Sequence, residues 1–193
     1  EHMADRIRHL MVGMEFQEII SNIMGSHQDF CTKMRVDGTE WAKVVEVDNV
    51  MSLSYSCLRQ WITPSLLQVE ANSSRAFYPH RMFEVGEVAV LDVNADIGSR
   101  TVTKLGAVIA HAGAHFSEIH SCLDLLLYYL DRPFTLEPVP HPSFLEGRAG
   151  AIVAGGRVIG LLGELHPEVL EQWQISVPAV SLELELDRLL DEG

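Results

Sequence analysis

The stretch that decides the fold is Ala151-Ile152-Val153-Ala154-Gly155-Gly156-Arg157-Val158-Ile159-Gly160-Leu161-Leu162. Apolar residues, several of them β-branched, stand on both sides of the Gly-Gly pair, which predicts two strands joined by a tight turn. A connection this short joins only antiparallel strands, because parallel strands need a long crossover. The sequence therefore predicts an antiparallel sheet in this part of the chain.

The remaining segments fit the same architecture. Residues 181–187 alternate leucine with acidic side chains, which predicts a strand with one buried face. Residues 117–130 place apolar side chains at helical spacing, which predicts a helix packed on a flat surface. Further strands are expected at 14–24, 44–47, 82–91, 102–110 and 134–139, and further helices at 4–11, 26–34, 53–59, 65–72 and 167–173. Because strands and helices do not alternate regularly, the pattern favours an α+β fold with a largely antiparallel sheet.

Length and charge narrow the classes of function. The 193 residues suit one full domain, and we expect residues 3–190 to form it, with Glu1 and His2 as a cloning remnant. The 14 basic and 27 acidic side chains give a net charge of −13 without any cluster of Lys or Arg, so we do not expect this chain to bind nucleic acid on its own. No apolar stretch approaches the roughly 20 residues that span a bilayer, so we expect no membrane partner.

The cysteines give no sign of a disulfide framework or a zinc clamp. Cys31, Cys57 and Cys122 are odd in number and show no C-x-x-C spacing. A reducing compartment such as the cytoplasm fits this usage best.

The richest polar group in the sequence is formed by His111, His115, His120 and Cys122. Three imidazoles and a thiol are zinc ligands in principle. Gly113 interrupts the first histidine pair, however, and His120 and Cys122 would point about 200° apart on an ideal helix. We interpret these residues as loop histidines and a core thiol, and expect no metal site. A metal-dependent hydrolase built on the three histidines is kept only as an alternative.

A series of motifs runs along the chain in a fixed order. The first part contains Asp48-Asn49-Val50-Met51-Ser52, Tyr55, Leu58-Arg59, Thr63-Pro64-Ser65-Leu66-Leu67, Asn72 and Arg81-Met82-Phe83-Glu84-Val85-Gly86. The second part contains Gly147-Arg148-Ala149-Gly150-Ala151 and Ile159-Gly160-Leu161-Leu162-Gly163-Glu164-Leu165-His166-Pro167. From about Met3 to Leu190 the sequence resembles the phenylalanyl-tRNA synthetase beta subunit, and the Gly-Glu-Leu-His-Pro run is the most specific part. Val50 departs from the pattern, because the family usually has proline there.

The resemblance implies a class II aminoacyl-tRNA synthetase-like fold, an antiparallel sheet flanked by helices, that has lost its chemistry. Active class II enzymes carry Phe-Arg-x-Glu in their second motif, where the arginine meets ATP phosphate. The comparable run here has Phe83, Glu84 and Gly86, so a carboxylate stands where a cation is needed. The third motif also needs an arginine, yet residues 160–171 contain none.

The resemblance further implies a non-catalytic structural module that pairs with the catalytic alpha subunit in a heterotetramer and supports aminoacylation of tRNA(Phe). No catalytic residue is assigned to this chain. It needs no cofactor of its own, since ATP and magnesium are used by the holoenzyme. The alternative is a free-standing relative without synthetase activity that binds a ligand or regulates another enzyme.

Residues 53–72 match the helix that forms the subunit interface in class II enzymes. Their apolar side chains spread around more than one face, and a helix that is apolar over a wide arc needs a second surface to cover it. The candidate interface therefore consists of Tyr55, Leu58, Trp61, Ile62 and Val69. The alternative is that loops of this chain cover those residues.

Overall fold

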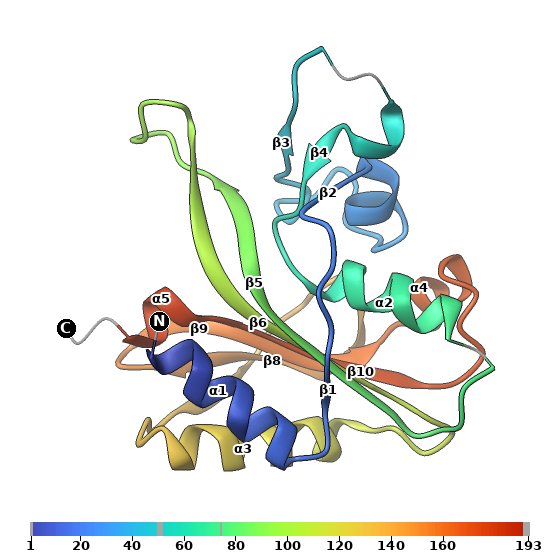
Figure 1. Ribbon diagram of the computed structural model, residues 1–193, viewed down its shortest axis with the longest axis vertical. Coiled ribbons are helices and arrows are strands. Elements are labelled where there is room, and N and C mark those ends of the chain that lie inside the picture. The colour runs from blue at the N-terminus through green and yellow to red at the C-terminus, as the bar shows by residue number, and fades with distance from the viewer. Residues whose placement is uncertain (1, 50–51, 74, 191–193) are drawn as a thin grey trace.

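A computed structural model describes residues 2–49, 52–73 and 75–190 (Figure 1). Within these residues, seven strands form one large sheet in the order β1-β5-β6-β10-β9-β8-β7. The strands are β1 (Gln17–Glu18), β5 (His80–Leu91), β6 (Ser99–Ala110), β7 (Thr135–Pro138), β8 (Phe144–Ala154), β9 (Arg157–Leu165) and β10 (Ala179–Glu185). Neighbouring strands are antiparallel except β1 and β5, which are parallel.

Helices cover both faces of the large sheet. On one face lie α1 (His2–Gly13) and α3 (Phe116–Tyr129), and on the other lie α2 (Thr63–Asn72) and α4 (Pro167–Gln172) (Figure 1). The short helix α5 (Leu186–Leu190) continues directly from β10. Each face has its own hydrophobic cluster: Leu182 and Leu184 pack in the cluster beneath α1 and α3, whereas Ala179 of the same strand packs in the other.

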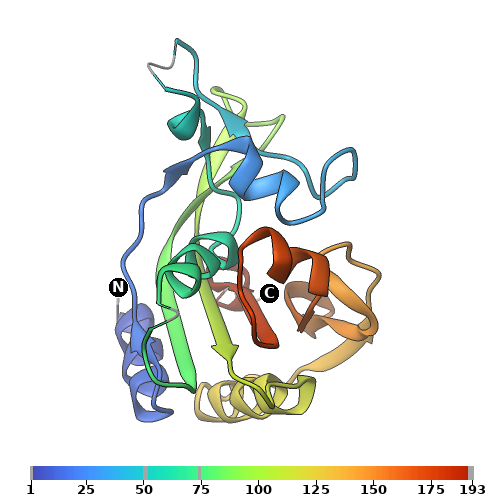
Figure 2. The same cartoon turned by 90° about the vertical axis from the view of Figure 1, so that its right-hand side faces the viewer.

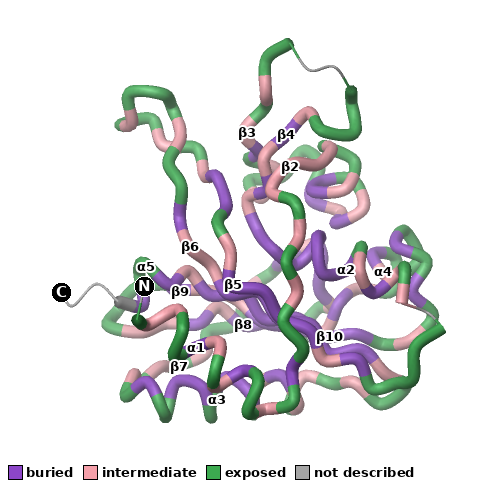
Figure 3. Tube along the Cα trace, viewed as in Figure 1, coloured by how far each residue is buried: buried purple, intermediate pink, exposed green. Residues whose placement is uncertain are grey.

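A smaller sheet lies beyond α2. It contains β2 (Met24–Gly25), β4 (Cys57–Leu58) and β3 (Val45–Glu46), paired antiparallel in the order β2-β4-β3. A π-helix, η1 (Gln28–Thr32), and a 3₁₀ turn, η2 (Leu53–Tyr55), accompany it. Figure 2 shows this region at the end of the molecule opposite α1 and α3. Its outer loops are exposed, whereas the centre of the large sheet is buried (Figure 3).

The structure confirms the antiparallel α+β fold with flanking helices. The hairpin predicted at 151–162 is formed by β8 and β9, and Gly155 and Gly156 of its turn have φ of +57° and +74°, which glycine adopts without strain. The helices expected at 4–11, 65–72, 117–130 and 167–173 are α1, α2, α3 and α4. Among the described helices, none has both the length and the apolar character needed to cross a bilayer.

Two predictions in the first third of the chain are wrong. The strand expected at 14–24 is reduced to β1 and the first residue of β2: Glu15, with a φ of +65°, turns the chain at its start, and residues 19–23 belong to no strand. The helix expected at 53–59 is replaced by η2 and β4. The backbone of Arg59 explains this difference: its N–H donates to Ile23 O and its carbonyl accepts from Ala89 N–H, both at 2.9 Å, so it lies extended between the two sheets.

A third prediction, for residues 26–34, is only partly right. The segment contains a helix, but a π-helix of five residues. Val50 and Met51 of the first motif lie outside the described residues, as does Glu1 of the expected cloning remnant, whereas His2 begins α1.

Candidate functional site

The residues of the second motif lie on β5 and point to opposite faces of the large sheet. Phe83 is fully buried in the cluster under α1 and α3. Glu84 points to the other face, where Arg59 Nη2 donates to its Oε1 at 2.7 Å and both side chains are buried. Ser21 Oγ donates to Glu84 Oε2 and accepts from Arg59 Nη1, at 2.5 Å and 2.7 Å. Glu84 therefore presents no free negative charge, contrary to what the motif alone implied.

Gly86 makes this network possible. A Cβ at Gly86 would lie 2.4 Å from Arg59 Nη2 and 2.8 Å from Glu84 Oε1. Any other residue there would displace the guanidinium, so three residues of the family signature, Arg59, Glu84 and Gly86, form one packed unit. In this chain the charge of the second motif is paired internally, at the junction between the two sheets.

A second buried carboxylate, Glu183, lies on the central strand β10 and points to the same face of the large sheet as Glu84. Its Oε1 accepts from Ile62 N–H at 2.7 Å, and its Oε2 accepts from Thr63 N–H at 3.1 Å and from the Thr63 hydroxyl at 2.9 Å. These donors stand at the start of α2, where backbone N–H groups lack helical partners. Burial raises the pKa of Glu183, while Lys104 and the three donors act in the opposite direction.

The burial of Glu183 corrects the expectation of a strand with one buried face. Alternation of leucine and acid indicates which side chains share a face. It does not indicate that α2 and the small sheet cover the second face as well. The sequence alone therefore predicts no structural role for Glu183. It shows only an acidic side chain, in a segment that forms a central strand of the sheet.

An open cleft of about 720 Å³ lies between the loop after η1 and the segment that enters β8. Its lining residues are Arg35, Thr39, Glu40, Trp41, Pro138, Val139, Pro140, His141, Pro142, Phe144, Leu145, Glu146, Gly147, Ala149 and His166. The Arg35 guanidinium at this cleft already pairs with Glu168 at 2.8 Å and donates to Pro142 O at 2.7 Å. It is thus engaged within the chain and not held ready for a phosphate.

His141 stands at the back of the cleft among aromatic rings. Its ring centroid lies 4.4 Å from that of Trp41, 5.7 Å from Trp61 and 5.1 Å from Phe144. Its Nδ1 accepts from Ser143 N–H at 3.2 Å. Burial lowers the pKa of His141 to about 4, so the imidazole is neutral at pH 7. At its His141 side the cleft therefore offers aromatic surface and a neutral imidazole, and Arg35, the arginine in its wall, is already paired with Glu168.

The signature residues of β9 and α4 connect strands to helices. Glu164 Oε1 accepts from Phe116 N–H at 2.8 Å, at the start of α3. His166 is the N-cap of α4, where its Nδ1 accepts from Glu168 N–H at 3.2 Å, and Pro167 occupies the first helical position. Through these contacts the end of β9 and the residue after it hold the first turns of α3 and α4 in place.

The glycine before this run is fixed by packing. A Cβ at Gly163 would lie 2.8 Å from both the Arg148 carbonyl oxygen and the Phe144 ring. Arg148 is itself exposed, and Gly147 has a φ of +72°.

The signature residues of α2 also serve the helix itself. Pro64 stands in its first turn, Leu67 is fully buried, and the Asn72 amide donates to Gln68 O at 2.8 Å. Apart from the exposed Arg148, the signature positions described above have packing, turn or capping roles.

The candidate interface residues do not form one exposed helix face. Trp61 and Ile62 are buried in the chain's own core, and Leu58 and Val69 are half-buried. Tyr55 alone among the five is largely exposed, at 51%. The expectation that Trp61 and Ile62 present an apolar surface is wrong, because Trp61 packs against His141 and Ile62 packs on Gly106 of the large sheet.

The histidines of the metal alternative have separate partners. His111 Nε2 lies 2.8 Å from Glu118 Oε2, His115 Nδ1 lies 2.8 Å from Gly113 O, and His120 Nε2 lies 3.7 Å from Asp124 Oδ2. In the described part of the chain a different group brings metal-binding atoms together, formed by His27, Cys31 and Asp37. Sequence reasoning missed this group, although the spacing of His27 and Cys31 is one that a helical turn brings to one side.

The large sheet with helices on both faces has the fold of a class II aminoacyl-tRNA synthetase. The structure is similar to that of PylSc, a pyrrolysyl tRNA synthetase from Desulfitobacterium hafniense, with a TM-score of 0.78. The match covers 98% of this chain and 66% of that chain, and at 18% sequence identity it shows the fold alone.

Sequence comparison defines the family within that class. The model of the phenylalanyl tRNA synthetase beta chain CLM domain matches residues 1–186, and the chain belongs to this family. Beta subunits of phenylalanine–tRNA ligase from Treponema pallidum subsp. pallidum and Thermococcus onnurineus are 38% and 34% identical over 188 and 198 residues. Each match covers 97% of this chain but only 31% and 35% of those relatives, so the chain spans about a third of their length.

Proposed function

We propose that the chain is a non-catalytic structural module of a phenylalanine–tRNA ligase beta subunit that holds the catalytic alpha subunit in the working assembly. The observation that carries the proposal is the buried Arg59–Glu84 pair at 2.7 Å. In this chain the second-motif strand carries an internal ion pair, at a place where an active class II enzyme needs a cation that is free to bind ATP phosphate. Family membership supports the same reading.

The proposal assigns the chemistry to the other subunit. ATP and magnesium are bound by the holoenzyme, and this chain holds no cofactor of the ligation reaction. Residues 3–190 act as one domain of the beta subunit within a heterotetramer. The free, buried cysteines suit the reducing cytoplasm.

Direct tRNA binding by this chain is expected to be weak. The net charge of −13 opposes a polyanion, and Arg8, Arg59 and Arg81 are engaged by Glu18, Glu84 and Glu118. Filter binding at low salt is expected to give affinities no tighter than the non-specific range of about 10⁻⁴–10⁻⁶ M. Tighter binding would assign tRNA recognition to this chain.

Two measurements test the main proposal. The chain alone is expected to show no phenylalanine-dependent ATP–pyrophosphate exchange, with the assembled ligase as positive control. The same chain is expected to co-purify with the alpha subunit encoded in the same genome. Exchange by the chain alone would overturn the non-catalytic role, and failure to co-purify would favour the free-standing relative.

A further inference from the structure

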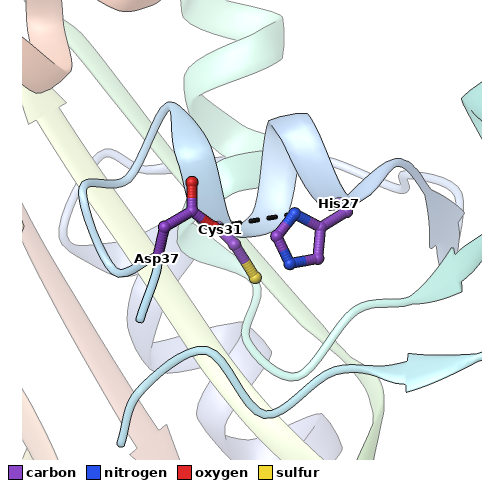
Figure 4. A group of neighbouring side chains, drawn as sticks. All are labelled: His27, Cys31 and Asp37. Carbon is purple, nitrogen blue, oxygen red and sulfur yellow. Dashed lines mark ion pairs between the residues drawn. The ribbon is translucent and has the colours of Figure 1, made fainter. Parts of the chain in front are cut away.

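The π-helix η1 and the loop after it bring three metal-binding side chains together (Figure 4). His27 immediately precedes η1, and Cys31 follows one turn later on the same side. The chain then reverses near Arg35, whose φ is +59°, and returns Asp37 to the other two. A nitrogen, a sulfur and an oxygen from these residues all lie within 4.8 Å of one another.

We propose that His27, Cys31 and Asp37 bind a single zinc-like divalent metal ion. Imidazole nitrogen, thiolate sulfur and carboxylate oxygen are all ligands of Zn²⁺, with bond lengths of about 2.0–2.3 Å. In a tetrahedral site with such bonds, ligand atoms stand about 3.4–3.6 Å apart. His27 Nδ1 and Asp37 Oδ1 are already 3.6 Å apart, and the Cys31 sulfur lies within 4.8 Å of both, so the set must contract by little more than about 1 Å to reach this spacing.

The burial of the three residues defines the kind of site. Cys31 is fully buried, whereas the side chains of His27 and Asp37 are 48% and 44% exposed. An ion there would have the protein on one side and solvent on the other. Three protein ligands leave a fourth position for water, as in zinc sites that are not purely structural.

An ordinary surface ion pair does not account for the group. A histidine–aspartate pair by itself needs no third metal-binding atom, yet the Cys31 sulfur lies within 4.8 Å of both. A bound cation would take the place of the thiol proton, as metal ions do at cysteine ligands.

The position of the site gives the ion a structural consequence. Asp37 lies in the loop that supplies Arg35, Thr39 and Trp41 to the wall of the cleft. A metal bond between Asp37 and η1 would fasten this wall to the helix. We therefore expect metal binding to order the loop and to hold the cleft in one shape.

The test uses the 193-residue chain, free of added histidine tags, with Zn²⁺ and with Co²⁺ as a spectroscopic substitute. Competition with a chromophoric chelator is expected to show one zinc per chain, and Co²⁺ is expected to produce a thiolate-to-cobalt charge-transfer band. His27→Ala and Asp37→Asn change half-exposed side chains and so spare the fold. Each is expected to weaken zinc binding by at least about tenfold, since even loss of a ligand's neighbour costs about 10–100-fold.

Matched controls separate the site from chance binding. His120 and Asp124 form another surface pair, at 3.7 Å, and His120→Ala should leave zinc affinity unchanged. Cys122 is another buried thiol, and Cys122→Ser should keep the charge-transfer band that Cys31→Ser removes. A band that survives Cys31→Ser, or zinc affinity unchanged in His27→Ala and Asp37→Asn, would overturn the proposal.

Amide hydrogen exchange supplies an independent measurement. Zinc is expected to slow exchange at residues 33–41 in the unmodified chain and in His120→Ala, but not in Asp37→Asn. Equal slowing in Asp37→Asn would show that the ion acts elsewhere and would likewise overturn the site.

Discussion

The large sheet and the small sheet are both antiparallel, yet they are stabilised in different ways. The central strands of the large sheet are 7 to 12 residues long, whereas each strand of the small sheet has only two residues. Long ladders repeat the same backbone hydrogen bonds and the same alternation of side chains. Two-residue strands cannot, so the small sheet depends on its contacts to the large one, among them the Arg59–Glu84 pair and the hydrogen bond from Ala89 N–H to the Arg59 carbonyl. Mutations at these contacts can therefore separate the two regions.

The largest effect is expected at Arg59, which joins the two sheets. Arg59→Met leaves Glu84 buried without its partner, and breaking a buried ion pair from one side costs about 3–5 kcal/mol. Urea denaturation measures this loss. The exposed pair between Arg8 and Glu18 provides the control, because Arg8→Met should cost about 1 kcal/mol or less.

The double variant Arg59→Met with Glu84→Gln sharpens the test. Removing both charges removes the uncompensated carboxylate, so much of the lost stability should return. A double variant as unstable as Arg59→Met alone would mean that packing of the Arg59 side chain, and not the ion pair, joins the sheets.

The sequence predicts the long strands of the large sheet well, because the patterns that indicate them lie within a few neighbouring residues. Leu182 and Leu184 alternate with acids, and Gly155-Gly156 stands between two apolar runs, so period and turn chemistry are visible within a few residues. Arg59 shows the opposite case. Its partners Glu84 and Ser21 are 25 and 38 residues away, and nothing around Arg59 signals an extended backbone between two sheets.

The candidate sites also divide into features that neighbouring residues predict and features that depend on residues far apart in the sequence. Helix starts such as Pro167 could be predicted from local residues, whereas the capping role of Glu183 depends on a partner about 120 residues earlier. The metal-binding group combines both cases. The His27–Cys31 spacing is local, but the return of Asp37 depends on the φ of +59° at Arg35, a non-glycine residue that gives no signal for it.

A second expected effect depends on pH and involves His141. Its ring packs against the rings of Trp41, Trp61 and the large-sheet residue Phe144. Its pKa falls from 6.5 to about 4 on folding, so the unfolded chain takes up the proton first as the pH drops. Stability should therefore decline between pH 6.5 and 4, by about 3 kcal/mol in full. His141→Phe keeps an aromatic ring and should remove this part of the decline. Identical pH profiles for the two chains in urea denaturation would contradict the assignment.

A smaller effect is expected at the cap that Glu183 provides. Glu183→Gln leaves one acceptor oxygen for donors that now use two, so one buried donor of Ile62 or Thr63 loses its partner. Such a loss costs about 1–3 kcal/mol. Glu185→Gln, on the same strand but only partly buried, is the matched control. Equal changes in the urea midpoint for the two variants would rule out the capping role.

The smallest effect on stability is expected at Tyr55, on the outer turn of the small sheet. The residue is 51% exposed, so Tyr55→Asp should change the free energy of unfolding by no more than about 0.5 kcal/mol. If the small sheet binds the partner while the large sheet stabilises the fold, the same variant should reduce co-purification with the alpha subunit.

Leu125 on α3 is the control: it is 44% exposed, also apolar, and lies on the opposite side of the large sheet. Leu125→Asp should leave co-purification intact, and an equal loss in both variants would mean that any new surface charge disturbs assembly. Gln68→Asp on α2 then locates the edge of the contact, because Gln68 is exposed while its neighbour Val69 is half-buried. A loss with Tyr55→Asp but not with Gln68→Asp would confine the partner surface to the small sheet.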